Sequence, residues 1–166
     1  MLFITIFQRW GIHNMTQKLL LLNGPNLNML GTREVDIYGT YTLKEIENIV
    51  RKTAEGKGFR VECFQSNLEG ELIDKIHEAK AKFDGIVFNP AAYSHTSIAI
   101  HDAIKSTGVP VVEIHISNIF NRESFRHQSI TAKACIGQIT GLGVYGYKLA
   151  TLAIINKITR KDDLIV

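Results

Sequence analysis

Glu113 and His115 stand two residues apart in the apolar run Gly108–Ile116, GVPVVEIHI. If that run is a strand, alternate side chains share a face, so the carboxyl group and the imidazole point the same way. A carboxylate beside an imidazole orients the ring and favours its protonated form, as a general acid requires. A structural ion pair has the same pattern, so the two residues alone favour neither interpretation.

A second pair lies in the polar connection Asn23–Tyr38, where Arg33 precedes Tyr38 by five residues. A connection of about fifteen residues without predicted structure suits an active-site lid. Tyrosine is a poor base near neutral pH unless a cation stabilises its phenolate, and Arg33 can supply that cation. A solvated tyrosine in a turn is the commoner case, so both interpretations stay open.

Amide and hydroxyl groups follow three predicted strands at the points where those strands end. Asn26 comes shortly after the first strand, Asn89 ends the third, and Ile116-Ser117 closes the fourth behind Glu113 and His115. In an open parallel sheet, ligands bind beyond the carboxyl ends of the strands. Because these groups come to one edge, the sequence predicts a ligand site there.

His95 and Arg126 are further candidates for binding an anion. His95 lies in Ser94-His95-Thr96-Ser97 before a predicted helix, where hydroxyl and backbone N–H groups can receive an anion. In the alternative, Thr96 or Ser97 is only a helix N-cap and His95 is exposed. Arg126 can bind a carboxylate through two hydrogen bonds, or it pairs with a surface glutamate.

Other chemistries are less well supported. A metal site built from Glu113, His115, His95 and Asp102 lacks an H-E-x-x-H motif or a recognisable Cys/His spacing. No G-x-S-x-G sequence supports a serine hydrolase. The glycines between 141 and 146 follow the last predicted strand, so close helix packing explains them better than phosphate binding.

Strand and helix signals alternate along the chain. We expect strands at Lys18–Asn23, Phe59–Gln65, Asp84–Asn89, Gly108–Ile116 and, more weakly, Ala132–Ile139. This alternation predicts an α/β fold with a parallel sheet and helices on both faces. At this length the flavodoxin-like three-layer sandwich, with strand order 2-1-3-4-5, is the default.

Helix boundaries are marked by capping signals. Thr42 with Glu45 forms a predicted capping box for a helix that ends near the glycines at 56 and 58. Asn67 is the predicted cap of the next helix. A third helix is expected from about Thr96, and an apolar final helix from Gly141 onward.

Composition restricts the class of protein. The 166 residues, 45% hydrophobic and 21% charged, suit one globular domain. A net charge of +3 with scattered basic residues does not favour nucleic acid, and no apolar run suits a membrane span. Cys63 and Cys135, outside any C-x-x-C motif, are expected to be reduced, buried thiols of a cytoplasmic protein.

The first residues look different from the rest. Residues 1–14 are apolar but lack both a preceding basic residue and a small-residue cleavage site, so a signal peptide is not expected. We therefore predict an N-terminal extension over residues 1–14 and a single catalytic domain over residues 15–166.

The motifs of the core, among them NGPNLN from Asn23 and EIHISN from Glu113, closely resemble the signature of the type II 3-dehydroquinate dehydratases. The resemblance runs in order from about Lys18 to Lys157, without an evident gap. Gln128 stands where histidine is expected and Ser94 where threonine is usual. The shared motifs are NGPNLN from Asn23, LG from Leu30, RE from Arg33, YG from Tyr38, NPAA from Asn89, HTS from His95, DA from Asp102, EIHISN from Glu113 and FR from Phe125.

The resemblance implies a reaction, namely the dehydration of 3-dehydroquinate to 3-dehydroshikimate in the shikimate pathway by anti elimination through an enolate. Tyr38 would be the base, kept ionised by Arg33. Asn26 would hold a water against the enolate oxygen. His115 would protonate the departing hydroxyl while Glu113 orients its ring.

The resemblance also implies binding and assembly properties. No metal, nucleotide or other cofactor would be needed. Asp102 would reach the site of a neighbouring subunit in a homo-oligomer, a dodecamer built from trimers. The residues that would hold the substrate's hydroxyls and carboxylate are Asn89, His95, Arg126 and the backbone at Ile116 and Ser117.

Two other functions use the same fold, because fold does not fix function. A flavin-binding module would need Ser, Thr and Gly after the first strand, where this chain has Pro25, Asn26 and Leu27. A receiver domain would need an aspartate at the end of the third strand, where this chain has Asn89. Both interpretations are therefore disfavoured.

Overall fold

The computed structural model describes residues 17–32 and 40–160, and its centre is one parallel sheet. The strand order is β2-β1-β3-β4-β5, which confirms the predicted flavodoxin-like arrangement. The strands are β1 Lys18–Asn23, β2 Arg60–Gln65, β3 Gly85–Asn89, β4 Val111–His115 and β5 Gly137–Thr140.

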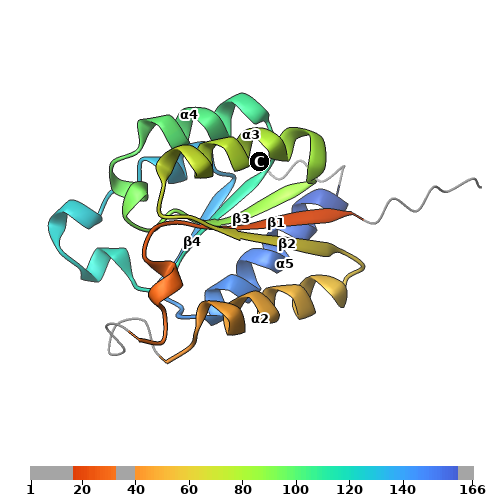
Figure 1. The fold of residues 1–166 in the computed structure, drawn as a ribbon, viewed down its shortest axis with the longest axis horizontal. Helices are drawn as coiled ribbons and strands as arrows, with labels where there is room; N and C mark the ends of the chain where they lie inside the picture. The colour runs from red at the N-terminus through yellow and green to blue at the C-terminus, as the bar shows by residue number, and fades with distance from the viewer. Residues whose placement is uncertain (1–16, 33–39, 161–166) are drawn as a thin grey trace, which may run out of the picture.

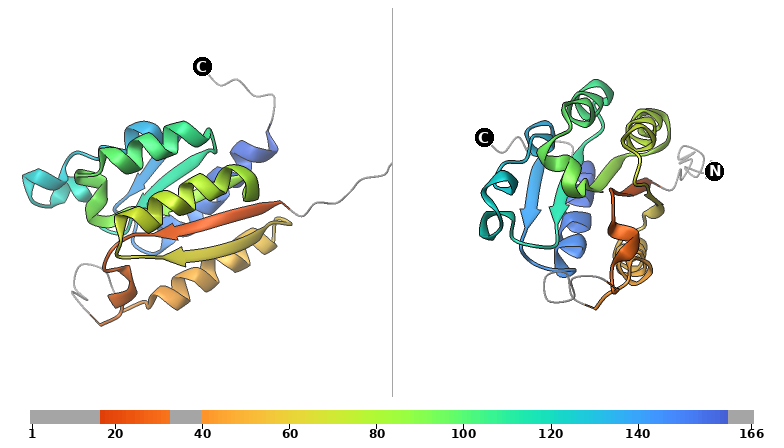
Figure 2. Two further views of the ribbon diagram at one scale, coloured as in Figure 1. Left: turned by 45° about the horizontal axis from the view of Figure 1, so that its top comes forward. Right: turned by 60° about the vertical axis from the view of Figure 1, so that its left-hand side comes forward.

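Helices cover both faces of this sheet, as Figure 1 shows. Helices α3, Glu69–Lys82, and α4, Ile98–Thr107, lie on one face. Helices α2, Leu43–Glu55, and α5, Tyr145–Thr159, lie on the other. The two further views in Figure 2 show the same three layers.

The run of four leucines in β1 explains why the sheet is buried on both sides. Leu19 and Leu21 pack into the core beneath α2 and α5, whereas Leu20 and Leu22 pack into the core beneath α3 and α4. Alternate residues of a strand face opposite ways, so a continuous apolar run serves both cores at once. β1 is thereby fixed in the interior of the sheet, where it pairs with β2 and β3.

Most local signals in the sequence are confirmed. Thr42 and Glu45 form the capping box of α2, and Ser97 caps α4 by accepting a hydrogen bond from the Ile100 N–H at 2.8 Å. Gly146 lies against β4, where an added Cβ would come within 2.5 Å of Ile114 Cδ1. Close packing therefore accounts for that glycine, as predicted.

Two local predictions are wrong. The expected fifth strand begins at Gly137, because Thr131–Ala134 forms a 3₁₀ turn whose Thr131 side chain bonds to Glu113 instead of continuing a strand. Asn67 is not the cap of α3, whose N-cap is Leu68. The Asn67 carboxamide oxygen instead accepts a hydrogen bond from the Asn26 N–H at 2.9 Å.

Short 3₁₀ turns follow the strands at the carboxyl edge of the sheet. Leu27–Met29 follows β1, Ala91–His95 follows β3, and Ile119–Asn121 and Ser124–Arg126 follow β4. In Figure 1 the strand arrows point towards the orange turn after β1 and the cyan turns after β4. The segments expected to carry the site therefore surround one end of the sheet.

The predictions about the cysteines, membrane spans and domain boundary are tested only in part. Cys63 and Cys135 are free and half-buried. No helix in the part of the chain that the structure describes is long and apolar enough to cross a membrane. Residues 1–14, the predicted extension, lie outside the described residues, so the proposed domain boundary stays a prediction.

The capping box gives a test of local stability. Thr42→Ala removes the hydroxyl that accepts from the Glu45 N–H, and we expect it to lower the free energy of unfolding by about 1 kcal/mol. Thr42→Ser keeps the hydroxyl and should lose much less. Urea denaturation of the two variants measures the difference, and equal stability would show that the cap contributes nothing.

Candidate active site

A cavity of about 150 Å³ opens at the carboxyl edge of the sheet. Its walls come from the turns after β1, β3 and β4, as expected for an open parallel sheet. Seven of the predicted site residues line it directly, together with Arg122, which was not predicted. Those seven are Asn26, Asn89, His95, His115, Ile116, Ser117 and Arg126.

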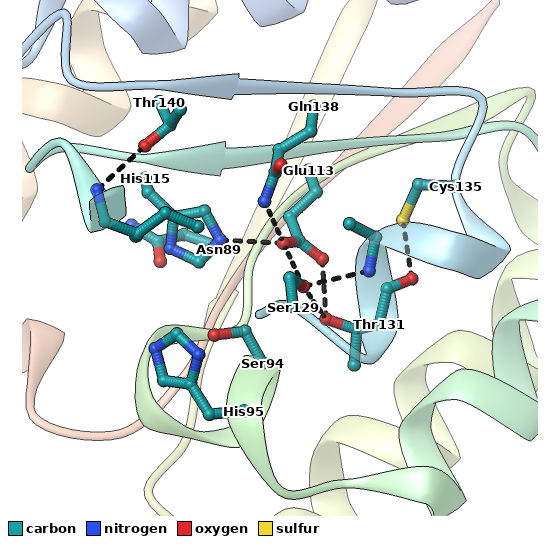
Figure 3. Close-up of polar contacts among 12 residues, drawn as sticks. Asn89, Ser94, His95, Glu113, His115, Ser129, Thr131, Cys135, Gln138 and Thr140 are labelled. Atoms are coloured by element: carbon teal, nitrogen blue, oxygen red, sulfur yellow. Dashed lines mark hydrogen bonds and ion pairs between the residues drawn. The ribbon is translucent and has the colours of Figure 1, made fainter. Parts of the chain in front are cut away.

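The Glu113–His115 pair predicted from the strand alternation is present. His115 Nε2 donates a hydrogen bond to Glu113 Oε1 at 2.7 Å, and Figure 3 shows the contact between the two side chains. His115 is 5% exposed and lines the cavity, whereas Glu113 is fully buried behind it. Since Glu113 occupies Nε2, Nδ1 is the nitrogen left to exchange a proton with a ligand.

Glu113 receives three further hydrogen bonds. Ser129 Oγ and Gln138 Nε2 donate to Oε1 at 2.7 and 2.9 Å, and Thr131 Oγ1 donates to Oε2 at 2.5 Å. Burial by itself raises the pKa of the Glu113 carboxyl, but His115 and these hydroxyl donors lower it below its usual value. The carboxylate is therefore ionised beside the imidazole.

His95 lies in the cavity wall with its ring held from behind. Its Nδ1 donates to the Gln128 carbonyl oxygen at 2.7 Å, and its ring stacks on that of His115 with centroids 6.3 Å apart. Burial is the largest cause of a lowered His95 pKa, and the positive charges of His115 and Arg126 lower it further. This histidine is thus suited to act as a neutral hydrogen-bonding group rather than as a cation.

A buried hydrogen-bond chain fixes the amide of Asn89. Asn89 Nδ2 donates to the Tyr147 hydroxyl at 2.7 Å, and that hydroxyl donates to Asn23 Oδ1 at 2.8 Å. Asn23 and Asn89 are opposite each other in the β1–β3 register, so one tyrosine from α5 reaches both. The Ala91 N–H donates to Asn89 Oδ1 at 3.1 Å, which fixes the other end of the amide.

The turn that carries Asn26 packs closely against the turn after β3. Asn26 adopts a left-handed conformation with φ of 65°, and its N–H is held by Asn67. A Cβ at Gly24 would come within 2.5 Å of the Pro90 carbonyl oxygen, so only glycine fits where the turns after β1 and β3 touch. The Asn26 side chain is thereby presented to the cavity.

Two arginines and a serine form the wall that follows β4. Arg126 Nε donates to Glu123 Oε2 at 3.0 Å, and Arg122 Nη1 donates to Ser117 Oγ at 3.4 Å. The surface glutamate partner considered for Arg126 is therefore present, and Arg126 lines the cavity as well. Its guanidinium group has more donors than Glu123 uses, so it can also hold an anion.

Of the predicted site residues that the structure describes, Glu113 and Asp102 do not line the cavity. The Asp102 side chain is 71% exposed on α4 and bonds to the neighbouring His101 Nδ1 at 3.0 Å. Arg33 and Tyr38 lie outside the described residues. Their expected roles stay predictions.

The groups behind the cavity were not predicted from the sequence. These groups are Ser129, Thr131 and Gln138 around Glu113, and Tyr147 behind Asn89. Gln138 was the one with a pattern that could have revealed it, because it lies opposite Glu113 in the register of β4 and β5. The fifth strand was predicted to start at Ala132 instead of Gly137, and the error in its start gave no correct register from which to pair the two residues.

A metal site is not evident. Among the described residues, no three His, Cys, Asp or Glu side chains gather closely enough to hold a metal ion. Asp102, one of the four residues considered for such a site, is exposed and does not line the cavity with His95 and His115.

Comparison with known proteins identifies the family. The family model described as Dehydroquinase class II matches residues 17–155. The chain belongs to the class II dehydroquinase family.

Relatives of known name agree with this family membership. The chain is 56% identical over 142 residues to a 3-dehydroquinate dehydratase of Bacillus cereus, which covers 86% of this chain and 97% of the relative. It is 57% identical to one of Bacillus cytotoxicus over the same shares.

Solved class II dehydroquinases have the same fold. The type II dehydroquinase of Butyrivibrio crossotus is 48% identical with a TM-score of 0.81, over 84% of this chain and 97% of that chain. That of Propionibacterium acnes is 42% identical with a TM-score of 0.82, over 86% and 98%.

The buried Glu113 carboxylate predicts a pH dependence of stability. Its pKa is lowered in the folded protein, so its contribution is present above the ordinary carboxyl value of 4.5 and is lost as pH falls through the folded value. Glu113→Gln should cost about 3 kcal/mol at pH 7, and this difference from the native protein should shrink towards pH 3.

Urea denaturation at several pH values measures this difference. Glu55→Gln, at an exposed position near the end of α2, is the matched control and should change little at any pH. A Glu113→Gln difference that stays constant from pH 7 to 3 would contradict an ionised carboxylate at this position.

Proposed function

We propose that the chain is a 3-dehydroquinate dehydratase that removes water from 3-dehydroquinate to give 3-dehydroshikimate. The observation that carries this proposal is the match of residues 17–155 to the Dehydroquinase class II model. The 56% identity to a relative named 3-dehydroquinate dehydratase supports the same activity. The His115 imidazole in the cavity wall, paired with the buried Glu113 carboxylate behind it, supplies a group that such a dehydration needs.

His115 is the proposed general acid. A departing hydroxide is a poor leaving group, so a proton must reach it as the carbon–oxygen bond breaks. The ionised Glu113 favours the protonated imidazole and fixes its plane, which leaves the Nδ1 proton for the hydroxyl. Glu113 acts through His115 and does not line the cavity.

Tyr38 is the proposed base. It would remove a proton from the carbon next to the ketone, and the resulting enolate would expel the hydroxyl from the opposite face. Arg33 would keep the phenolate ionised. Both assignments rest on the resemblance of the RE and YG motifs, since Arg33 and Tyr38 lie outside the described residues.

Asn26 is the proposed support for the enolate. The fixed left-handed turn presents its amide at the cavity, where it would hold a water molecule against the developing negative oxygen. A preorganised donor of this kind stabilises charge without rearrangement during the reaction.

The remaining cavity groups suit the substrate's carboxylate and hydroxyls. Arg126 supplies a cation for the carboxylate, while the neutral His95 and the fixed Asn89 amide supply hydrogen bonds to hydroxyls. The backbone at Ile116 and Ser117 completes this wall, and the carbonyl of Ile116 is held by the Gly143 N–H at 3.0 Å.

Assembly and location are further parts of the proposal. Asp102, exposed on α4, would reach a neighbouring subunit's site in a homo-oligomer, a dodecamer of trimers by family analogy. The enzyme would work in the cytoplasm without a cofactor.

The activity is tested directly with the purified chain and 3-dehydroquinate in the presence of a metal chelator. The product contains a double bond conjugated with its carbonyl, so we expect ultraviolet absorbance to rise with time. Borohydride added with substrate should leave the activity unchanged. An absence of product from folded protein would refute the assignment, and inactivation by borohydride would point to an imine mechanism.

The proposed acid and base are tested by substitution. His115→Ala and Tyr38→Phe should each lower kcat at least about 100-fold, because each removes a proton-transfer group. His77→Ala and Tyr145→Phe, at exposed positions on α3 and α5, are matched controls and should keep normal rates. A near-normal kcat for either site variant, with its fold intact, would refute that residue's role.

A further inference from the structure

Most of the donors to the Glu113 carboxylate lie away from the cavity. Of its four hydrogen-bond partners among the described residues, His115 lines the cavity, whereas Ser129, Thr131 and Gln138 do not. Figure 3 shows Gln138 reaching in from β5 and Ser129 and Thr131 from the turn before that strand. The hydrogen bonds of these three side chains to Glu113 therefore connect them to the cavity, although none of the three lines it.

Thr131 has a distinct place among these donors. Its hydroxyl is the donor that the described part of the chain provides to Oε2, at 2.5 Å, and the residue is fully buried. His115, Ser129 and Gln138 share the other oxygen, Oε1. Fixing Oε2 from one side sets the rotation of the carboxylate, and with it the direction in which Oε1 faces His115.

The segment that carries Thr131 also holds the second histidine of the cavity. The Gln128 carbonyl accepts from His95 Nδ1, and the Ile130 N–H donates to the Ser94 carbonyl oxygen at 2.7 Å. Residues 128–131 thus connect the backing of His95 to that of His115. A shift of this segment would move both rings, which stack on each other.

We propose that Thr131, with Ser129 and Gln138 in support, is a positioning residue that keeps Glu113 ionised and aimed at His115. The inference rests on the proposed function for its effect on catalysis. A carboxylate that accepts several hydrogen bonds from neutral donors stays charged in a buried site. A charged Glu113 holds the Nε2 proton of His115 and favours the imidazolium that serves as the acid.

The other titratable groups near this carboxylate are few. His115 contributes positive charge from the cavity side, whereas His95, whose ring stacks on that of His115, is kept neutral mainly by burial. Arg126 lines the same cavity. Cys135 approaches from the turn before β5, and burial together with the Glu113 charge raises the pKa of its thiol. Cys135 therefore stays a neutral thiol near pH 7, and the hydroxyl and amide donors remain the neutral groups that stabilise Glu113.

The test compares Thr131→Val, which has nearly the same shape without the hydroxyl, with Thr131→Ser, which keeps it. ¹³C NMR of the Glu113 carboxyl reports its titration in each full-length protein. We expect Thr131→Val to raise the pH at which Glu113 titrates by about one unit, and Thr131→Ser to titrate as the native protein does.

Kinetics give the second readout. Thr131→Val should lower kcat for 3-dehydroquinate by about tenfold, the effect of one hydrogen bond to a charged group, while KM changes less than about twofold. Thr131→Ser should restore kcat. A purely structural role would instead lower the thermal stability of Thr131→Val without moving the Glu113 titration or kcat, and that result would overturn the proposal.

Two further results also decide between the positioning role and the proposed function. If the Glu113 titration shifts as expected while even the native protein does not act on 3-dehydroquinate, the proposed function fails and the positioning role stands. If Thr131→Val does not fold, Gln138→Met, which removes a donor to Oε1, is measured in the same way. An unchanged Glu113 titration in a folded Gln138→Met protein would then overturn the inference.

Discussion

A buried negative charge at Glu113 is the constraint on which the site depends. An ionised carboxylate taken out of water is costly unless its oxygens are paired and hydrogen-bonded. Glu113 meets this requirement with donors from its own strand, from β5 and from the turn between them. The chain must therefore bring Gly137–Thr140 beside β4 in one register and fold Thr131–Ala134 into a turn. His115 is held because the carboxylate behind it is held.

The Asn89 amide, on the neighbouring strand β3, is fixed by neutral hydrogen-bond partners instead of a buried charge. Tyr147 comes from the last helix, yet its hydroxyl joins the ends of the first and third strands through Asn23 and Asn89. Burial raises the pKa of this tyrosine far above its ordinary value, so the hydroxyl stays neutral and serves only as donor and acceptor. The cavity amide is thus fixed by the packing of α5 on the sheet, whose register on β4 is set by Gly146 against Ile114.

Features set by neighbouring residues could be predicted from the sequence, whereas contacts between residues far apart in the chain could not. The apolar run in β1, the alternation that placed Glu113 and His115 on one face and the capping box at Thr42 are local patterns, and all three are confirmed. Asn67 and Thr131 were misassigned because their side chains bond to Asn26 and Glu113, far away in sequence, instead of to the nearest helix or strand. No local pattern carries such a contact, since it exists only after the sheet has formed. Tyr38 and Arg33 lie outside the described residues, so their assignment still depends on the resemblance.

We propose that Glu113 fixes the tautomer of His115 and leaves Nδ1 to give up the proton. The most direct test is ¹⁵N NMR of the histidine side chains in the resting protein as a function of pH, with the His115→Ala protein used to assign the signals. If Glu113 fixes the ring, Nε2 of His115 stays protonated throughout while Nδ1 alone gains and loses its proton. A neutral His115 that carries its proton on Nδ1 would contradict this role of Glu113.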